Sequence, residues 1–518
     1  MKRLISLTLT FIMLLTLAAC DVDELSRRLD ELSETYPDAT PLILSDSMSS
    51  VPEGVTVTHD IVYYEAGHDF TYGEGTVEDA HSAEEAAAHT VVTITAPGTY
   101  LLTGSLSKGQ VAVDLGEDAK TDPNAVVTLI LGEVDITCTV APAVIFYNVY
   151  ECGSTDTETA TYDVDTSAAG ANVIIADDSV NNISGSYVAR IYKSVELSED
   201  GTEVIDSKKL HKYDAAFYSK MSMNIDGGTL DTGTLNIKAE NEGLDSELHL
   251  TMNGGNVNIV SGNDGINTNE DGVSVTTIND GVLNIRCDGS TGEGDGIDSN
   301  GWLVINGGTV TAQACATSGD AGIDSDMGIY LNGGVIMASG NMADRIAGGD
   351  ATYALFEFAQ PVSSGQSVKL KDANGGLLMM YTAENAFSTL ILSVNTMTAG
   401  DYSLWVDDVQ MAHGGISGGR DFGGRMHGEF DPAAMEGMEP PADFDPARRE
   451  EMTPPDGFDR GMGQPEAFDP SAMEGMTPPD GFDRGMEQLD GEQSSVFTLA
   501  EGGNQFRGVG EYIPVEAQ

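Results

Sequence analysis

Apolar and polar residues alternate in short runs between residues 214 and 345, and these runs recur with a common phrase. Four copies place Leu or Ile before Asp or Asn, and an earlier copy places Phe before Tyr. The central apolar residues are Phe217, Leu244, Ile266, Ile297 and Ile323, at spacings of 27, 22, 31 and 26 residues. Alternation with a period of two predicts half-buried strands, and the intervening Asn-Gly-Gly and Asn-Asp-Gly sequences predict tight turns. A repeat of this length with about three strands predicts stacked parallel sheets, an all-β right-handed parallel β-helix solenoid.

The segments on either side of the repeats predict a different organisation. Residues 1–20 begin with basic residues, continue with an apolar run and end in Ala-Ala-Cys, which predicts a lipoprotein signal peptide lipidated at Cys20. No later run has the roughly 20 apolar residues that a membrane helix needs. The other predicted segments are a tether over 21–50, the β-helix over 51–345, a small antiparallel β cap over 346–412, a disordered acidic insertion of Met, Pro, Gly and Asp repeats over 413–493, and a final cap strand and tail over 494–518.

The chain is strongly acidic, with 83 Asp and Glu residues against 24 Lys and Arg residues and a formal net charge of −59. Such a surface repels nucleic acid and anionic lipid headgroups, so neither is expected as a direct partner. The same charge favours the binding of cations.

The polar residues of the repeated phrase predict two columns that point out from the strands, and a third column that precedes each strand. The columns are Asp245, Asn267, Asp298 and Asp324; Glu247, Asn269, Asn300 and Asp326; and Glu242, Asp264, Asp295 and Asp320. Unpaired carboxylates about 5 Å apart on neighbouring repeats repel by roughly 1 kcal/mol even in water. Ca²⁺ relieves this repulsion and accepts carboxylate, amide and carbonyl oxygens with loose geometry, whereas Mg²⁺ requires a tighter octahedron. The alternative is that Asp and Asn serve the turns and are simply solvated.

Evidence for catalysis in the sequence is weaker. A polysaccharide lyase needs a Lys or Arg base beside its metal, and Lys220 and Arg286 are the candidates, with Lys238 and His249 nearby. The alternative role for Lys220 is a salt bridge to the acidic columns. No Ser-His-Asp arrangement, phosphate-binding loop or Cys-x-x-Cys motif occurs.

The four cysteines after Cys20 allow two interpretations. In an exported protein Cys138 would pair with Cys152, and Cys287 with Cys315, the latter pair lying on adjacent repeats. Alternatively, all four are buried free thiols that act as small apolar residues.

Several of these sequences resemble a bacterial family of cellulose- and pectin-binding β-helix proteins, which are similar to pectate lyases. The resemblance covers about 90–345 and rests on Gly98-Thr-Tyr-Leu-Leu-Thr-Gly, Val126-Val-Thr-Leu-Ile-Leu, Asp214-Ala-Ala-Phe-Tyr-Ser-Lys and the Asn-Asp-Gly-Ile and Asn-Gly-Gly sequences. It implies a right-handed β-helix with bound Ca²⁺ that binds polysaccharide without cleaving it. The metal ligands that it implies by position are Asp264, Asn267, Asp295, Asp298, Asp320 and Asp324; the column itself adds Asp245. Ala321 and Glu242 depart from the phrase, and the second copy has an insertion at 270–273.

The leading hypothesis is an exported, monomeric protein that faces outward from the cell surface and is anchored to the membrane through lipid on Cys20. It would bind cellulose or polygalacturonate through a Ca²⁺-loaded β-helix, with Trp302 and Tyr330 as candidates for stacking on sugar rings. The alternatives are a Ca²⁺-dependent polysaccharide lyase and a structural or adhesive spacer without a glycan ligand.

Overall fold

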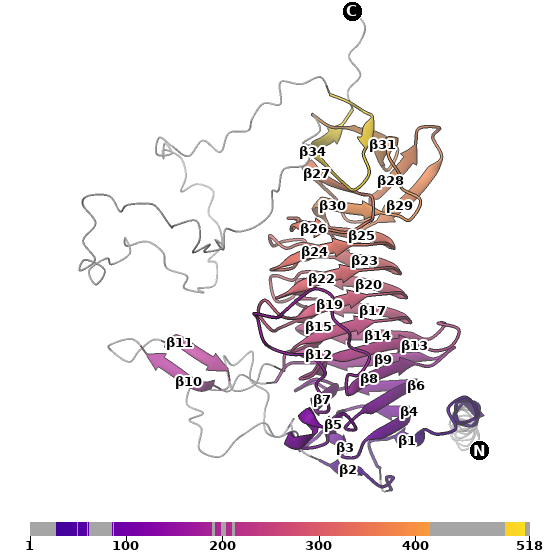
Figure 1. The fold of residues 1–518 in the computed structure, drawn as a ribbon, viewed down its shortest axis with the longest axis vertical. Helices are drawn as coiled ribbons and strands as arrows, with labels where there is room; N and C mark the ends of the chain where they lie inside the picture. The colour runs from indigo at the N-terminus through magenta and orange to yellow at the C-terminus, as the bar shows by residue number, and fades with distance from the viewer. Residues whose placement is uncertain are drawn as a thin grey trace, which may run out of the picture. The chain divides into compact units, whose positions relative to one another are not determined.

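The computed structural model describes residues 27–48, 50–59, 61, 85, 87–188, 213–414 and 493–512, and the backbone of 192–197 and 204–209. The predicted signal peptide with Cys20 and nearly all of the predicted disordered insertion (415–492) lie outside the described residues. Within the described residues, no helix has the length and apolar character needed to cross a membrane. The described chain is all-β, built mainly from strands that pair in parallel and stack in rows, as Figure 1 shows.

Three rows of strands run through the stack. The first row is a sheet of β2 (Val55–Thr58), β3 (Thr90–Ile94), β5 (Gly109–Asp114), β7 (Val144–Asn148), β12 (Ala215–Ser219), β15 (Glu242–Ser246), β18 (Ile266–Thr268) and β21 (Ile297–Ser299). The second row is β1 (Thr40–Leu44), β4 (Gly98–Leu106), β6 (Val127–Thr137), β8 (Ala171–Ile175), β13 (Met223–Gly227), β16 (His249–Met252), β19 (Val275–Ile278), β22 (Trp302–Ile305), β24 (Gly328–Leu331) and β26 (Ile346–Gly348). The third row is β9 (Val180–Gly185), β14 (Thr234–Ala239), β17 (Asn256–Ser261), β20 (Val282–Cys287), β23 (Thr309–Gln313) and β25 (Val335–Gly340).

The repeated phrase forms the first row in the expected register. Leu244 pairs with Ile266, Ile266 with Ile297, and Ile297 with Ile323, all in parallel. These side chains are at most 2% exposed and belong to one apolar core that continues through all three rows. The prediction of long parallel sheets is therefore confirmed, and the arrangement is compatible with a β-helix.

The Asn-Gly-Gly and Asn-Asp-Gly turns join the second row to the third, and each ends in a glycine with positive φ. The values are 84° at Gly255, 93° at Gly281, 73° at Gly308 and 92° at Gly334. A Cβ on Gly308 would also lie 2.8 Å from the carbonyl oxygen of Gly281 in the preceding repeat. Glycine is needed there both for its backbone conformation and for the close stacking of turns.

Replacing Gly308 by Ala is expected to lower the free energy of unfolding by about 1–3 kcal/mol, because the new side chain meets strained backbone and a fixed carbonyl. Gly319→Ala is the matched control, since no atom lies within 4 Å of a Cβ at that position. Chemical denaturation of both variants measures the difference. Equal stabilities for the two variants would contradict this account of the turns.

A smaller antiparallel unit follows the last repeat. Its strands are β27 (Tyr353–Val362), β28 (Ser367–Asp372), β29 (Leu377–Thr382), β30 (Phe387–Ser393), β31 (Gly400–Val406), β32 (Val409–Ala412), β33 (Phe497–Leu499) and β34 (Gly503–Glu511). β30 pairs antiparallel with β25, so this unit covers the exposed edge of the third row. It has an apolar core of its own, in which Phe356, Phe497 and Phe506 contact one another.

The start of the chain differs from the prediction. Residues 27–35 form a helix, and β1 pairs in parallel with β4, so 40–44 belong to a sheet and not to the predicted tether. Leu42 and Leu44 are almost fully buried, which explains why this segment packs against the stack. A 3₁₀ helix covers Glu117–Thr121, and β10 (Tyr192–Leu197) and β11 (Val204–Lys209) pair antiparallel as a separate two-stranded sheet.

Candidate functional site

The acidic residues of the phrase stack along the first row. Asp245 lies in register with Asn267, and Asn267 with Asp298; Asp324 follows Ile323, which bridges to Ile297. The side chains point away from the apolar core because they alternate with the buried Leu and Ile residues. The structure thus aligns Asp245, Asn267, Asp298 and Asp324. We use the name acid column for these four residues together with Asp264, Asp295 and Asp320, which lie just before them in the same repeats.

Three acids of the column bind backbone of a neighbouring repeat. Asp264 Oδ1 accepts a hydrogen bond from the Asp295 N–H at 2.7 Å, and Asp295 Oδ1 accepts one from Ala321 at 2.5 Å. In the last repeat Asp320 Oδ2 accepts from the Gly294 N–H at 2.6 Å. Asp320 therefore lies one position out of step with Asp264 and Asp295, because Ala321 occupies the equivalent place. Each of these carboxylates joins one repeat to the next as well as carrying charge.

The first acid of the column is not at the surface. Asp245 is fully buried and accepts hydrogen bonds of 2.9 and 3.0 Å from Asn269 Nδ2. Burial and the neighbouring carboxylates of Glu242 and Glu247 raise the pKa of Asp245 well above its usual range. Glu247 in turn accepts a hydrogen bond from the Tyr218 hydroxyl of the preceding repeat. A carboxylate enclosed in this way does not contact a polysaccharide directly.

Burial and mutual repulsion raise the pKa of four further acids in this region. The pKa of Asp264 is raised well above its usual value by burial and by Glu242, Asp298 and Asp295. Burial raises the pKa to about 8 for Asp295, about 6 for Asp298 and about 7 for Asp324, with neighbouring carboxylates adding to each shift. The raised pKa values show that no positive group in the described part of the chain compensates these carboxylates when they are ionised.

Whether Ca²⁺ could bind in the acid column depends on which oxygen atoms are available to coordinate it. Asn267 is 9% exposed and its Oδ1 has no hydrogen-bond partner, although its Nδ2 lies 3.4 Å from Glu242 Oε1. An unpaired buried oxygen beside carboxylates is the kind of ligand that Ca²⁺ accepts. Among the described residues, however, no three Asp, Glu, His or Cys side chains group as a metal site. A cation here would need amide and carbonyl oxygens as well as carboxylates.

One acid of this region was missed by the sequence analysis. Asp344 lies after the last clear repeat, yet its Oδ2 accepts a hydrogen bond of 3.2 Å from the Ser325 N–H. Its charge also raises the pKa of Asp324 and Asp298. The sequence signal for Asp344 was weak, namely an acid two residues before Ile346. In the structure Ile346 pairs with Ile329, so the second row continues after the repeated phrase has ended.

The candidate lyase bases have other roles. Arg286 Nε lies 3.2 Å from Glu384 Oε2 of the C-terminal unit. Lys220 forms no salt bridge to the acid column within the described residues; its Nζ lies 5.8 Å from the centroid of the Tyr213 ring. His249 is buried, which lowers its pKa to about 4, and its Nδ1 accepts a hydrogen bond from the Val275 N–H at 3.1 Å.

The four cysteines in the described chain are free thiols, so the structure contains neither of the two disulfides considered from the sequence. Burial raises the pKa of Cys138 to about 12 and that of Cys287 further still. Cys287 Sγ donates to the carbonyl oxygen of Asp295 at 3.0 Å, which satisfies it inside the core. Cys138, Cys287 and Cys315 are buried as small residues of the interior, whereas Cys152 is only partly buried.

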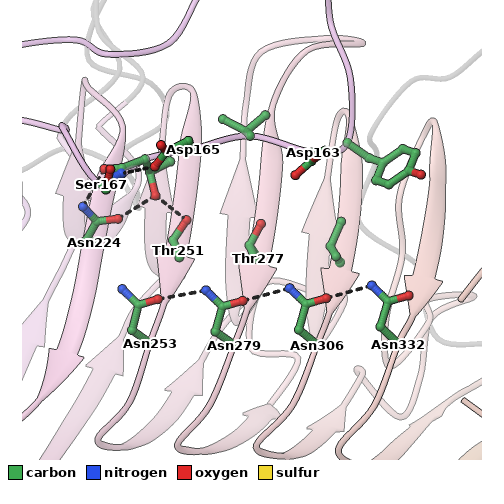
Figure 2. A pocket seen from close by; sticks show the side chains of 14 residues that line it. Asp163, Asp165, Ser167, Asn224, Thr251, Asn253, Thr277, Asn279, Asn306 and Asn332 are labelled. Atoms are coloured by element: carbon green, nitrogen blue, oxygen red, sulfur yellow. Dashed lines mark hydrogen bonds between the residues drawn. The ribbon is translucent and has the colours of Figure 1, made fainter. Parts of the chain in front are cut away.

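A groove lies on the outer face of the second row, away from the acid column. Residues 162–167, which we call the strap, cross this row as shown in Figure 2. Between the strap and the strands is a cavity of about 320 Å³, lined mostly by polar side chains. Along its floor run Asn253, Asn279, Asn306 and Asn332, whose amides form hydrogen bonds of 2.7–2.8 Å from one repeat to the next. We call this row of side chains the asparagine ladder.

The two aromatic residues predicted for sugar contact differ in position. Tyr330 stacks on Tyr162 of the strap, with ring centroids 4.0 Å apart and planes at 19°. Trp302 is partly buried at the start of β22 and does not line the groove. The strap was not predicted as part of a site, because nothing in its own sequence indicates that it packs on strands 60–170 residues later.

Comparison with known proteins identifies the family of this chain. No curated protein matches the chain. A solved structure, of a polysaccharide lyase-like protein from C. thermocellum, is similar with 19% sequence identity and a TM-score of 0.34, covering 60% of this chain and 93% of that chain. The model of the carbohydrate-binding domain-containing protein family matches residues 88–403, which include the acid column, the strap and the asparagine ladder. The chain therefore belongs to the carbohydrate-binding domain-containing protein family.

Proposed function

We propose that this protein binds plant-type polysaccharide, cellulose or polygalacturonate, on a right-handed parallel β-helix and does not cleave it. The observation that carries the proposal is the family match over 88–403, which includes most of the stacked rows and part of the C-terminal antiparallel unit. The salt bridge of Arg286 to Glu384 supports binding over lyase chemistry, because it engages one of the two candidate bases elsewhere. Lys220, whose Nζ lies over the Tyr213 ring, is the base of the lyase alternative.

Ca²⁺ is proposed as a structural ion of the acid column. Asp264, Asp295 and Asp298 would hold it together with Asn267 Oδ1, with Asp245, Asp320 and Asp324 as the neighbouring acids. The ion would supply the positive charge that these stacked carboxylates otherwise lack. Because Asp245 is enclosed, an ion beside it would stabilise the repeats and would not bridge to a glycan.

Export and anchoring complete the proposal. The leader that ends in Cys20 supports a lipid-anchored protein on the outer face of the membrane, where polysaccharide is available. A monomer is proposed, with no nucleic-acid partner because of the net charge of −59.

Retention on insoluble cellulose and on polygalacturonate tests this function. The protein is expected to be retained on at least one of them, and chelator is expected to leave retention unchanged well below the unfolding temperature, because the ion is structural. Ultraviolet absorbance of the supernatant follows unsaturated products. Formation of such products would replace binding by lyase activity, and no retention on either material would favour the spacer function.

A further inference from the structure

The strap is held at both ends and leaves a gap between them. At one end the Thr166 hydroxyl lies 2.7 Å from both Asn224 Oδ1 and Thr251 Oγ1, and Asn224 Nδ2 donates to the Thr166 carbonyl oxygen at 2.8 Å. At the other end Tyr162 stacks on Tyr330. Thr166 is 5% exposed, so this end is firmly packed. The strap therefore forms a wall of the groove whose position is fixed by side-chain contacts at both ends.

The strap runs along the stack, across successive repeats. Thr251, Thr277, Val304 and Tyr330 pair in order along the second row, so the two fixed ends are three repeats apart. Three repeats span about 14 Å, and the four residues from Thr166 to Tyr162 reach about 13 Å when extended. The groove thus has the shape required for an extended chain that lies parallel to the stack.

The floor of the groove presents the same polar groups at every repeat. Asn279 and Asn306 each use one N–H and one acceptor site on their neighbours in the ladder, and Asn253 at one end donates its N–H to Asp226 Oδ1 instead. Since an amide has two N–H donors and two acceptor lone pairs, every residue of the ladder keeps at least one donor and one acceptor for a ligand. All four side chains are exposed, and the repeat distance is about 4.8 Å. Sugar hydroxyls, which both donate and accept, match such a surface.

The wall that faces this ladder determines which glycan fits. Asp163 and Asp165 of the strap are exposed and line the same cavity. Carboxylates accept hydrogen bonds from hydroxyl groups but repel the carboxylates of uronic acids. Tyr162 at the end of the strap lines the cavity and is 42% exposed, so its ring can contact a sugar.

We propose that the groove between the strap and the asparagine ladder binds one extended chain of a neutral polysaccharide, of the β-linked glucan class, parallel to the stack. This inference rests on the proposed function and makes it more specific. It assigns neutral glycan to the groove and excludes polygalacturonate from it.

The test compares two similar ladders. The third row carries its own amide ladder, in which Asn258 Nδ2 donates to Asn236 Oδ1 at 2.9 Å, with no strap residue lining the cavity beside it. Asn279→Ala is expected to weaken binding of a soluble cello-oligosaccharide three- to tenfold, the effect of about one hydrogen bond, as measured by calorimetry. Asn258→Ala is the matched control and should leave affinity unchanged. Equal effects of the two variants, or none from either, would overturn the inference.

A second variant tests the charge of the wall without altering the ladder. Asp163 is exposed, so Asp163→Lys should preserve the fold, which thermal unfolding verifies. The variant is expected to gain at least tenfold in affinity for an oligogalacturonide relative to the cello-oligosaccharide. An unchanged ratio would overturn the inference while retention on polysaccharide still supports the proposed function. If the unmodified protein binds no polysaccharide at all, both proposals fail.

Discussion

Addition of Ca²⁺ at pH 8 is expected to raise the midpoint of thermal unfolding by about 5–10 °C, whereas at pH 5 it should change the midpoint by much less. The reason is the protonation state of the carboxyl groups in the acid column. Burial raises the pKa of Asp298 to about 6, of Asp324 to about 7 and of Asp295 to about 8, from an ordinary value of 3.8. At pH 5 protons neutralise these groups, and little is gained from a cation.

The sign of the pH dependence follows from the same values. Above pH 4 the unfolded chain releases its protons, whereas the folded chain retains them until the pH reaches about 6 to 8. Without Ca²⁺, stability is therefore greatest below the unfolded pKa and is lost as the pH rises through the folded pKa values. Between its unfolded and folded pKa values, each group lowers the free energy of unfolding by about 1.4 kcal/mol for each unit of pH increase.

Differential scanning calorimetry in chelator and in excess Ca²⁺, between pH 5 and pH 8, measures both effects. Asp298→Asn should reduce the pH dependence, and Asp118→Asn, at an exposed position of the 3₁₀ helix, is the matched control. A midpoint that responds equally to Ca²⁺ at both pH values would refute the structural ion. The same result with Mg²⁺ as with Ca²⁺ would indicate screening by divalent charge and no selective site.

The second large effect is expected from the apolar stack beneath the acid column. Ile297→Ala should lower the free energy of unfolding by about 2–5 kcal/mol, because it leaves a cavity in a close-packed core. Ile297 is fully buried and pairs with both Ile266 and Ile323, so partial collapse of the cavity is opposed from two repeats.

Denaturant unfolding of Ile297→Ala, beside Leu230→Ala as control, measures this loss. Leu230 is 70% exposed, and its truncation should change stability by less than about 0.5 kcal/mol. Because Asp298 is the next residue, the core variant should also show a smaller response to Ca²⁺. A loss below about 1 kcal/mol would mean that the repeats do not depend on one another at this position.

The sequence was sufficient to predict the stacked strands, because the information is local. Alternation around Leu244, Ile266 and Ile297 defines the inward face, and the glycine at the end of each turn marks where the chain reverses. The column of Asp245, Asn267 and Asp298 follows from the same register. Its burial does not follow, since enclosure depends on side chains such as Glu242, Glu247 and Asn269 that surround each carboxylate in three dimensions.

The groove could not have been predicted, because its parts are distant in sequence. Tyr162 meets Tyr330 across 168 residues, and Thr166 meets Thr251 across 85. The strap has no hydrophobic period that would indicate a packed segment. For the same reason β1 was assigned to a tether: a single short strand shows its partner only in the folded chain.

The series of parallel repeats in the third row ends at β25, because β30 pairs with β25 in the antiparallel direction. A parallel stack presents the same unsatisfied edge after every repeat, so nothing within a repeat determines where the series ends. Once an antiparallel strand occupies that edge, no further parallel repeat can be added at this end. Repeats can then be gained or lost only within the stack. Each such change would lengthen or shorten the asparagine ladder by one asparagine.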